Sequence, residues 1–184
     1  FGKTGEKNMS DYKKIFKNQI KRAKKGDAEA QFQVGEAYFK GTFYCKKNGK
    51  KAFKFFEKSA AQGNLRGTVG LGKCYEKGEG TARNAEQAIR LYREAAEANE
   101  TSGQLALGMA YYYGINGERD LVLAREWFER VAERNEGKAM DYLAQMYENG
   151  EGVPVDLGKA LEWNQKILEL ANTDPEVKTY YSDL

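Results

Sequence analysis

Residues that could carry chemistry are few in this 184-residue chain. Histidine is absent, so neither a histidine-based triad nor a histidine-ligated zinc site can be built. The two cysteines, Cys45 and Cys74, follow no metal-binding or redox spacing. Acidic residues are scattered without an isolated pair suited to general acid–base catalysis, and we interpret them as solvated helix surface. The sequence therefore predicts no catalytic residue, no metal site, no cofactor and no enzymatic activity.

Two short motifs are similar to parts of penicillin-recognising enzymes. Ser10 and Lys13 fit the Ser-x-x-Lys pattern, and residues 3–5 fit Lys-Thr-Gly. Their order along the chain is reversed, and the Ser-Asp-Asn element of those enzymes is missing. We attribute the matches to chance and expect Ser10 to be the N-cap of a helix.

A Gly-Glu-Gly motif occurs at Gly78–Gly80 and again 72 residues later at Gly150–Gly152. The backbone amides of such a loop could bind an anion. However, neither copy matches a phosphate loop or a dinucleotide-binding motif, and each follows a helical pattern rather than a strand. We interpret both copies as turns that reverse the chain, and their separation indicates an internal repeat.

The repeat has a period of 36 residues, with one extra residue in the first loop. Each unit contains two helical patterns, with a glycine that ends the first helix and, as at Asn84, an N-cap residue before the second. A residue suited to the left-handed conformation follows the second helix in most units. The aligned columns are Tyr38, Tyr75, Tyr111 and Tyr147; Gly41, Gly78, Gly114 and Gly150; Ala52, Ala88, Ala124 and Ala160; and Gly63, Asn99, Asn135 and Ala171.

Small residues recur inside the first helix of every unit, where glycine costs about 1 kcal/mol relative to alanine. This recurrence predicts a close approach of the paired second helix. The second helix carries an aromatic residue in three units, whereas Asn164 takes its place in the fourth, and we expect Trp163 to fill that space. The small residues are Gly35, Gly72, Gly108 and Ala144, and the aromatic residues are Phe56, Tyr92 and Phe128.

This spacing is typical of tetratricopeptide-type helix pairs, but the period is longer than 34 residues. The extra length lies in the loop, as in "YENGEGVPVDLGKALEW". Together with "SAAQGN" and "EAAEAN", the loop resembles the Sel1-like repeat family over residues 27–171. The first unit lacks the Gly-x-Gly of the loop, and the third has Gly-Ile-Asn-Gly at 114–117. The resemblance implies an all-α fold, a right-handed α-α superhelix (solenoid) of about nine to ten helices.

Domain boundaries follow from the repeat. We expect residues 1–9 to form a disordered or non-native N-terminus and residues 10–26 to form a capping helix. Four repeats follow at about 27–63, 64–99, 100–135 and 136–171. Residues 172–184 are expected to form a C-terminal capping helix or the start of a truncated repeat. Because the chain begins with Phe1 rather than Met, we also expect it to be a fragment of a longer protein.

Solenoids of this kind hold a peptide, loop or helix against their stacked first helices. The resemblance places the inward positions one, four and five residues after the small-residue column. Tyr112 and Tyr113 are of most interest, because Tyr111 already fills the packing column and exposed aromatic residues are enriched in binding hot spots. Local packing near Ile115 is the alternative. The inward positions are Glu36, Phe39 and Lys40; Lys73, Glu76 and Lys77; Met109, Tyr112 and Tyr113; and Gln145, Glu148 and Asn149.

Charge is distributed unevenly. Residues 1–63 contain 16 Lys and Arg against 6 Asp and Glu, whereas residues 64–184 contain 14 against 21. The basic segment Lys13–Lys25 could bind nucleic acid or anionic lipid, although solvated helix faces are the simpler interpretation. Tyr12 and Phe16 lie on the apolar side of this segment and are expected in the core rather than stacked on bases.

The leading hypothesis is a non-enzymatic adaptor or regulatory protein that binds a protein or peptide partner through its concave face, which the stacked first helices are expected to line. We expect no small-molecule substrate, no nucleic acid and no membrane span, since no run of about 18 apolar residues occurs. One alternative is a hydrolase or a protein related to the cell wall or β-lactams, as the cysteine-rich members of the family imply. Cys45 and Cys74 do not follow the paired pattern of those members. Another alternative is an anionic-surface binder that uses the basic N-terminal end.

Overall fold

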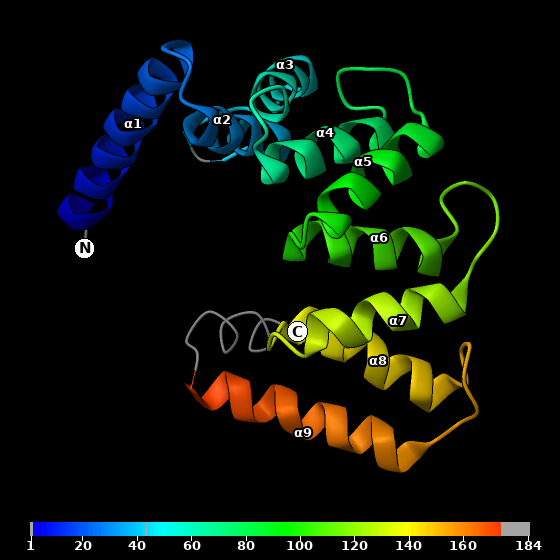
Figure 1. Ribbon diagram of the computed structural model, residues 1–184. Helices are drawn as coiled ribbons and strands as arrows, with labels where there is room; N and C mark the ends of the chain where they lie inside the picture. Colours follow the sequence, from blue (N-terminus) through cyan, green and yellow to red (C-terminus); the bar gives the residue numbers. More distant parts are fainter. Residues whose placement is uncertain (1, 43, 174–184) are drawn as a thin grey trace. The chain divides into compact units, whose positions relative to one another are not determined.

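A computed structural model describes residues 2–42 and 44–173 of the chain, with side chains from residue 11 onward. In this part the chain is an all-α helical repeat solenoid, as the sequence predicted, and Figure 1 shows its helices arranged as successive pairs. An isolated bridge between Thr42 and Cys45 is the only β-type pairing within these residues. The described helices are α1 (Gly2–Lys24), α2 (Ala28–Lys40), α3 (Gly49–Ala60), α4 (Leu65–Lys77), α5 (Ala85–Glu97), α6 (Thr101–Tyr113), α7 (Leu121–Ala132), α8 (Gly137–Asn149) and α9 (Leu157–Thr173).

The second helix of each pair begins at a capping side chain, and the same residue closes the loop. In the second pair, the side chain of Asn84 accepts a hydrogen bond from the backbone N–H of Gln87. The backbone N–H of Asn84 donates to the carbonyl of Tyr75, at 2.9 Å. The other pairs repeat both interactions, which satisfy backbone groups that a helix end leaves without partners. The corresponding cap and carbonyl pairs are Asn48 with Tyr38, Asp120 with Tyr111, and Asp156 with Tyr147.

The turn residues adopt the conformations that the sequence predicted. Gly78 and Gly150 end α4 and α8 in the left-handed region, with φ values of 70° and 71°. Asn99 and Asn135 adopt φ values of 68° and 61° after α5 and α7. A left-handed residue at these points reverses the chain without a break in the repeat period, because the final helix carbonyls still receive hydrogen bonds.

The small-residue column lies directly under the aromatic residue of the paired helix, which confirms the predicted close approach. A Cβ atom added to Gly72 would lie 2.5 Å from Cε1 of Tyr92, and one added to Gly108 would lie 2.8 Å from Cε1 of Phe128. Gly35 stands in the same relation to Phe56, at 2.7 Å. The fourth pair has Ala144 in the column and Asn164 in place of the aromatic residue. In this pair, Trp163 packs against the hydrophobic core that contains Phe128 and Met146.

The N-terminal helix is longer than the sequence predicted. It begins at Gly2, whereas we expected a tail over residues 1–9 and a helix from residue 10. Ser10 therefore lies inside α1 rather than at its N-cap. Residues 2–24 contain no proline, so nothing in this segment forces the helix to end earlier. At the other end α9 continues to Thr173, and the predicted C-terminal cap falls mostly on residues 174–184, outside the described residues.

The chain divides into two compact units, Phe1–Gly103 and Gln104–Leu184. In the first unit, α1 packs on α2 through Phe16 and Ala23, which share a core cluster with Val34. Partly buried Phe55 of α3 packs against the same cluster. Phe16 is buried as expected, but the expectation for Tyr12 is wrong, because its side chain is 55% exposed and stacks on Tyr44. In the second unit the core gathers side chains of α6, α7, α8 and α9, among them Phe128 and Met146, which are fully buried.

Candidate interaction surface

Each Gly-Glu-Gly turn joins the two helices of one pair and contacts the corresponding loop of the preceding pair in the same unit. Glu79 forms an ion pair with Lys47 at 2.6 Å, and Glu151 forms one with Arg119 at 2.8 Å. The backbone N–H of Glu79 donates to the carbonyl of Cys74, as that of Glu151 does to Met146. Because these amides are used at the helix ends, they are not available to hold an anion. This geometry supports the turn interpretation of the motif.

The second glycine of each turn sits where the preceding pair leaves no room for a side chain. A Cβ atom on Gly152 would lie 2.6 Å from Cβ of Leu121, the first residue of α7. A Cβ atom on Gly80 would collide with the backbone of Gly49, the first residue of α3. Gly80 and Gly152 also have φ values of 81° and 71°. Glycine is therefore required here for packing as well as for conformation.

In the first unit, the predicted binding positions of α2 and α4 form one connected surface. The ammonium of Lys77 lies 5.7 Å from the ring centre of Phe39, a cation–π contact that links the two helices. Glu36 and Lys40 form an ion pair one turn apart at 3.2 Å. Glu76 has a structural role, because its carboxylate accepts a 2.6 Å hydrogen bond from the buried hydroxyl of Tyr92. Lys73 is partly buried on the same helix.

Burial raises the pKa of the Tyr92 hydroxyl, and the Glu76 carboxylate adds to this effect. The phenol therefore stays protonated and continues to donate its hydrogen bond at neutral pH. Glu76 is thus held by the core behind it rather than being free to meet a partner.

In the second unit, the predicted pair Tyr112 and Tyr113 divides into a buried and an exposed residue. Tyr112 is only 9% exposed, and it packs edge-on against Tyr142 and tilted against Phe128. Its hydroxyl donates a hydrogen bond to Glu151. The packing alternative therefore holds for Tyr112, although its partners differ from the predicted Ile115.

Arg119 and Glu151 hold Tyr112 in place. The guanidinium of Arg119 lies 4.9 Å above its ring, and Arg119 also donates to the Tyr112 carbonyl at 2.7 Å. Burial and the hydrogen bond to Glu151 raise the pKa of Tyr112 to about 12. The same hydrogen bond, with that from Arg119, lowers the pKa of Glu151.

Tyr113 is 59% exposed and stands on this buried cluster. Its ring meets Tyr112 edge-on at 5.1 Å, and its hydroxyl lies 2.9 Å from that of Tyr142. The remaining predicted positions of α6 and α8 range from partly buried to exposed. Met109 packs against the core cluster, Gln145 donates to Asp141 at 3.0 Å, and Glu148 and Asn149 are exposed.

Sequence reasoning did not select Tyr142, Arg119 or Glu151. Tyr142 occupies a column that holds Gly70 in the second pair, and its ring stacks on Phe128 at 4.6 Å. The sequence did contain one indication that Tyr142 has a special role, because the second repeat has glycine, Gly70, at the same position. The contact between Arg119 and Glu151 joins residues 32 positions apart, and only the matching separation of Lys47 and Glu79 could have indicated it.

Neither cysteine has the surroundings of a reactive or disulfide-bonded residue. Both are free and buried, so the paired-cysteine alternative has no structural counterpart. Burial raises the pKa of the Cys45 thiol, and burial raises that of Cys74 to about 12. Thiols that are held protonated in this way are poor nucleophiles.

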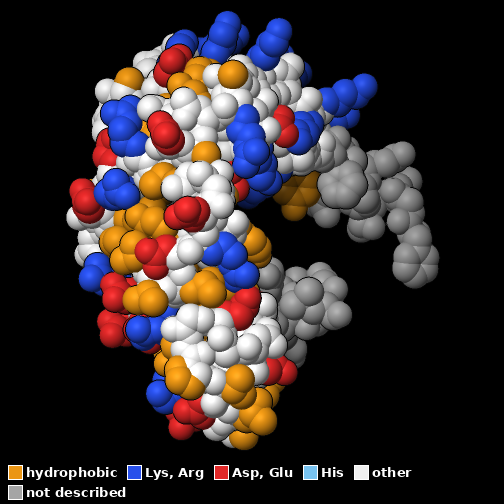
Figure 2. All heavy atoms as spheres, turned by 90° about the vertical axis from the view of Figure 1, so that its right-hand side faces the viewer, with side chains coloured by type: hydrophobic (Ala, Val, Ile, Leu, Met, Phe, Trp, Pro, Cys, Tyr) orange, Lys and Arg blue, Asp and Glu red, His pale blue; other side chains and the backbone are white. Residues whose placement is uncertain are grey.

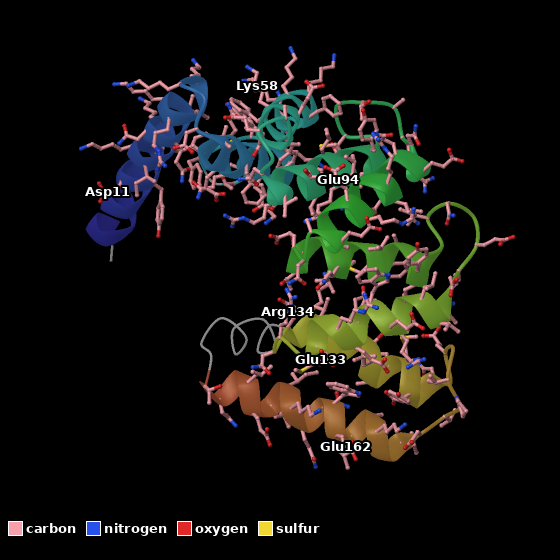
Figure 3. The ribbon with its side chains drawn as sticks, viewed as in Figure 1. Asp11, Lys58, Glu94, Glu133, Arg134 and Glu162 are labelled. Atoms are coloured by element: carbon pink, nitrogen blue, oxygen red, sulfur yellow. The ribbon has the colours of Figure 1, made fainter. Side chains whose placement is uncertain are left out.

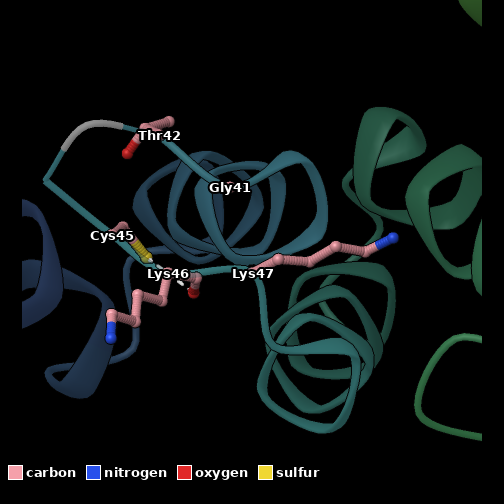
Figure 4. A pocket seen from close by; sticks show the side chains of 5 residues that line it. All are labelled: Gly41, Thr42, Cys45, Lys46 and Lys47. Atoms are coloured by element: carbon pink, nitrogen blue, oxygen red, sulfur yellow. Dashed lines mark hydrogen bonds between the residues drawn. The ribbon is translucent and has the colours of Figure 1, made fainter.

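A depression of about 360 Å³ is lined by Gly41, Thr42, Cys45, Lys46 and Lys47. Figure 4 shows the side chains of Lys46 and Lys47 pointing in opposite directions along the loop. Small-molecule sites have polar groups that converge on the ligand. The depression lacks this feature, and we assign it no ligand.

The described part of the chain offers neither a metal-binding cluster nor a membrane-spanning helix. No cluster of three or more Cys, Asp or Glu residues there could hold a metal ion. None of the helices in residues 2–42 and 44–173 is both long and apolar enough to cross a membrane.

Comparison with known proteins gives a family and a set of structural neighbours. The family model of the Sel1 repeat matches residues 28–64, 67–100, 101–136 and 137–172. These ranges lie within three residues of the repeat bounds predicted from the sequence. Among curated proteins, none matched the chain.

Three solved structures are similar to this chain. A Sel1 repeat protein from Oxalobacter formigenes is 31% identical with a TM-score of 0.72, over 84% of this chain and 61% of that one. The protective antigen c5321 of uropathogenic Escherichia coli, which displays an SLR fold, is 30% identical with a TM-score of 0.70, over 84% of this chain and 33% of that one. A putative Sel1 repeat protein from Klebsiella pneumoniae is 26% identical with a TM-score of 0.64, over 90% and 83%. The chain thus spans less than two thirds of the first two relatives.

Proposed function

This chain belongs to the Sel1 repeat family, and we propose that it is a non-enzymatic module that binds a protein or peptide partner on the exposed face of its first helices. The family suggests a protein–protein interaction module, and its members are generally scaffolds without enzymatic activity. The position of this face, its key residue and the class of partner are our proposal.

Tyr113 is the observation that carries the proposal. An exposed tyrosine offers a large apolar surface and a hydroxyl, and it loses little conformational entropy when it binds. Here the aromatic ring rests on Tyr112 and Tyr142, so its position is fixed before a partner arrives. Preorganisation of this kind lowers the cost of binding.

The first unit offers a second surface of similar character. Phe39 lies between the core ring of Phe56, at 6.0 Å, and the Lys77 ammonium. Exposed Lys40 and partly buried Glu36 flank it. An apolar ring with positively and negatively charged side chains around it can bind an extended or helical peptide that carries apolar and charged residues.

A selection from a random peptide library displayed on phage tests the proposal. Peptides selected on the wild-type protein should bind Tyr113→Ala weaker by more than about 2 kcal/mol, as expected for a hot spot. Val122→Ala is the matched control, because Val122 is also exposed, at 52%, but lies on second helix α7. Helicity measured by circular dichroism should be the same in both variants. Equal affinity for wild type and Tyr113→Ala, or a larger loss in the control, would reject this binding face.

A further inference from the structure

Two helices of the first unit carry equivalent rows of lysines on their outer sides. The rows are Lys13, Lys17 and Lys21 on α1 and Lys50, Lys54 and Lys58 on α3, and we call them the lysine rows. Each residue in one row stands 37 positions from its counterpart, which is the repeat spacing at this point of the chain. All six side chains are exposed.

The rows face away from the core that joins the two helices. Phe16 and Ala23 of α1 are buried against α2, and so are Ala52 and Phe56 on the inner side of α3. Lysines spaced four residues apart lie about 6 Å apart along the opposite side of each helix. Figure 3 labels Lys58 on the outer side of α3, and Figure 2 shows Lys and Arg side chains gathered over this end of the first unit.

Few acidic residues lie near the lysine rows to offset their positive charge. Residues 13–25 contain no acidic residue, and Glu57 is the only one in α3. None of the six lysines forms an ion pair with another residue between 11 and 173. Lysines one turn apart repel each other, which destabilises a helix.

The other second helices show that this arrangement is not a property of the repeat. At the same three columns, α5 has Glu86, Arg90 and Glu94, where opposite charges alternate at each turn. In α7 and α9 the second and third columns also hold an acid followed by a base, Glu126 with Arg130 and Glu162 with Lys166. The repeat fold therefore does not require lysine at these columns, since acidic and basic residues occur together there in other units. Only α1 and α3 of the described helices carry positive charge alone there.

We propose that the lysine rows bind the surface of a membrane rich in anionic lipids. Lysines near such a surface each contribute to binding by charge alone and need no fitted pocket. The rows contain no arginine forks and no aromatic rings, which are the groups that read or stack on bases. They also lie on two helices, α1 and α3, that each pack on α2, rather than on one element that could enter a groove of a duplex. These features favour a lipid surface over a nucleic acid.

A membrane bound at the lysine rows would leave the proposed peptide-binding face of the first helices accessible to a partner. In the first unit, Phe39 and Lys40 belong to α2 and Lys77 to α4, whereas the lysine rows belong to α1 and α3. A partner bound at the first-helix face would then be held at the membrane. The membrane contact does not rest on the proposed peptide binding, and either can fail without the other.

Co-sedimentation with lipid vesicles tests the proposal. The full chain should bind vesicles that contain phosphatidylserine at low salt and should not bind vesicles of phosphatidylcholine alone. Binding should weaken steeply with salt, because the Debye length falls from about 10 Å at 0.1 M to about 3 Å at 1 M. The variant Lys50→Glu, Lys54→Glu, Lys58→Glu should bind about a hundredfold weaker or worse.

A matched control separates the lysine rows from net charge. Arg90→Glu, Lys159→Glu, Lys166→Glu makes the same change in net charge at exposed positions outside the rows, and it should retain most of the binding. An equal loss in the control, equal binding to both kinds of vesicle, or no binding at low salt would overturn the proposal. Tighter lysine-dependent binding to a DNA duplex of arbitrary sequence would overturn it in favour of nucleic acid. Circular dichroism should confirm that each variant remains helical.

Discussion

Replacement of Gly72 by alanine tests whether the glycine column exists for packing. An added Cβ atom would lie 2.5 Å from Cε1 of Tyr92 and 2.9 Å from Cδ1, whereas ordinary contact begins at 3.4 Å. The Tyr92 ring is only 1% exposed, so it has no open space to move into. Its hydroxyl is also held by the carboxylate of Glu76 at 2.6 Å. The added methyl group must therefore displace the ring and strain this hydrogen bond.

Two effects of opposite sign decide the outcome. Alanine is favoured over glycine inside a helix by about 1 kcal/mol, which stabilises the variant. Overpacking of a closed core costs about 1–3 kcal/mol, and loss of a hydrogen bond to a charged group costs about 1.5–3 kcal/mol. The packing effect is larger, so we expect Gly72→Ala to lower the free energy of unfolding by about 2 kcal/mol.

Urea unfolding followed by circular dichroism measures this change. Gly158→Ala is the control, because Gly158 is an exposed glycine in α9 whose added Cβ atom would meet only Asp156 Oδ1, at 3.3 Å. It should be neutral or slightly stabilising. In a Tyr92→Ala background, Gly72→Ala should become stabilising, since the ring is gone. If Gly72→Ala has the same effect with and without the ring, or is as stable as wild type, the packing argument is wrong.

Three further predictions concern charge and reactivity. Because the folded-state pKa of Glu151 is lowered, its contacts with Tyr112 and Arg119 add stability above the ordinary value of 4.5, and this stability is lost as pH falls through the lowered pKa. Glu151→Gln should therefore unfold more easily at neutral pH and lose less stability on acidification, as measured by thermal melts across pH. Lys54→Glu should raise the melting temperature at low salt, because attractions to Lys50, Lys51 and Lys58 then replace three repulsions and outweigh one new repulsion from Glu57; an unchanged or lower value would contradict the reasoning. Cys74 should resist iodoacetamide in the folded protein and react in urea, as mass spectrometry can measure, because burial raises its pKa to about 12.

The repeat columns could be predicted because each reflects a local requirement that recurs every 36 residues. Asn84 at a helix start, Gly78 at a helix end and Asn99 in the left-handed region all depend on backbone conformation. Such requirements are satisfied by neighbours in sequence. The close approach at Gly72 could also be inferred, since glycine inside a helix needs a reason.

The exposure of individual side chains on the first helices could not be predicted in the same way. Tyr112 shares a column with Phe39 and Glu76, yet it is buried because Tyr142 and Glu151 lie against it. Neither neighbour belongs to a column that repeats in every unit. The start of α1 was also missed, because its sequence has no breaker and Ser10 offered a plausible cap.

The match between Gly72 and Tyr92 also affects how such a chain can change over generations. A duplication that copies α4 and α5 together carries a compatible glycine and ring into the new position. An exchange of α4 for α8 would place Ala144 under the ring, where its methyl group has no room. Recombination is therefore expected to succeed when it joins chains between helix pairs, at turns such as Gly63 or Asn99, and to fail within a pair when it brings Ala144 under an aromatic ring.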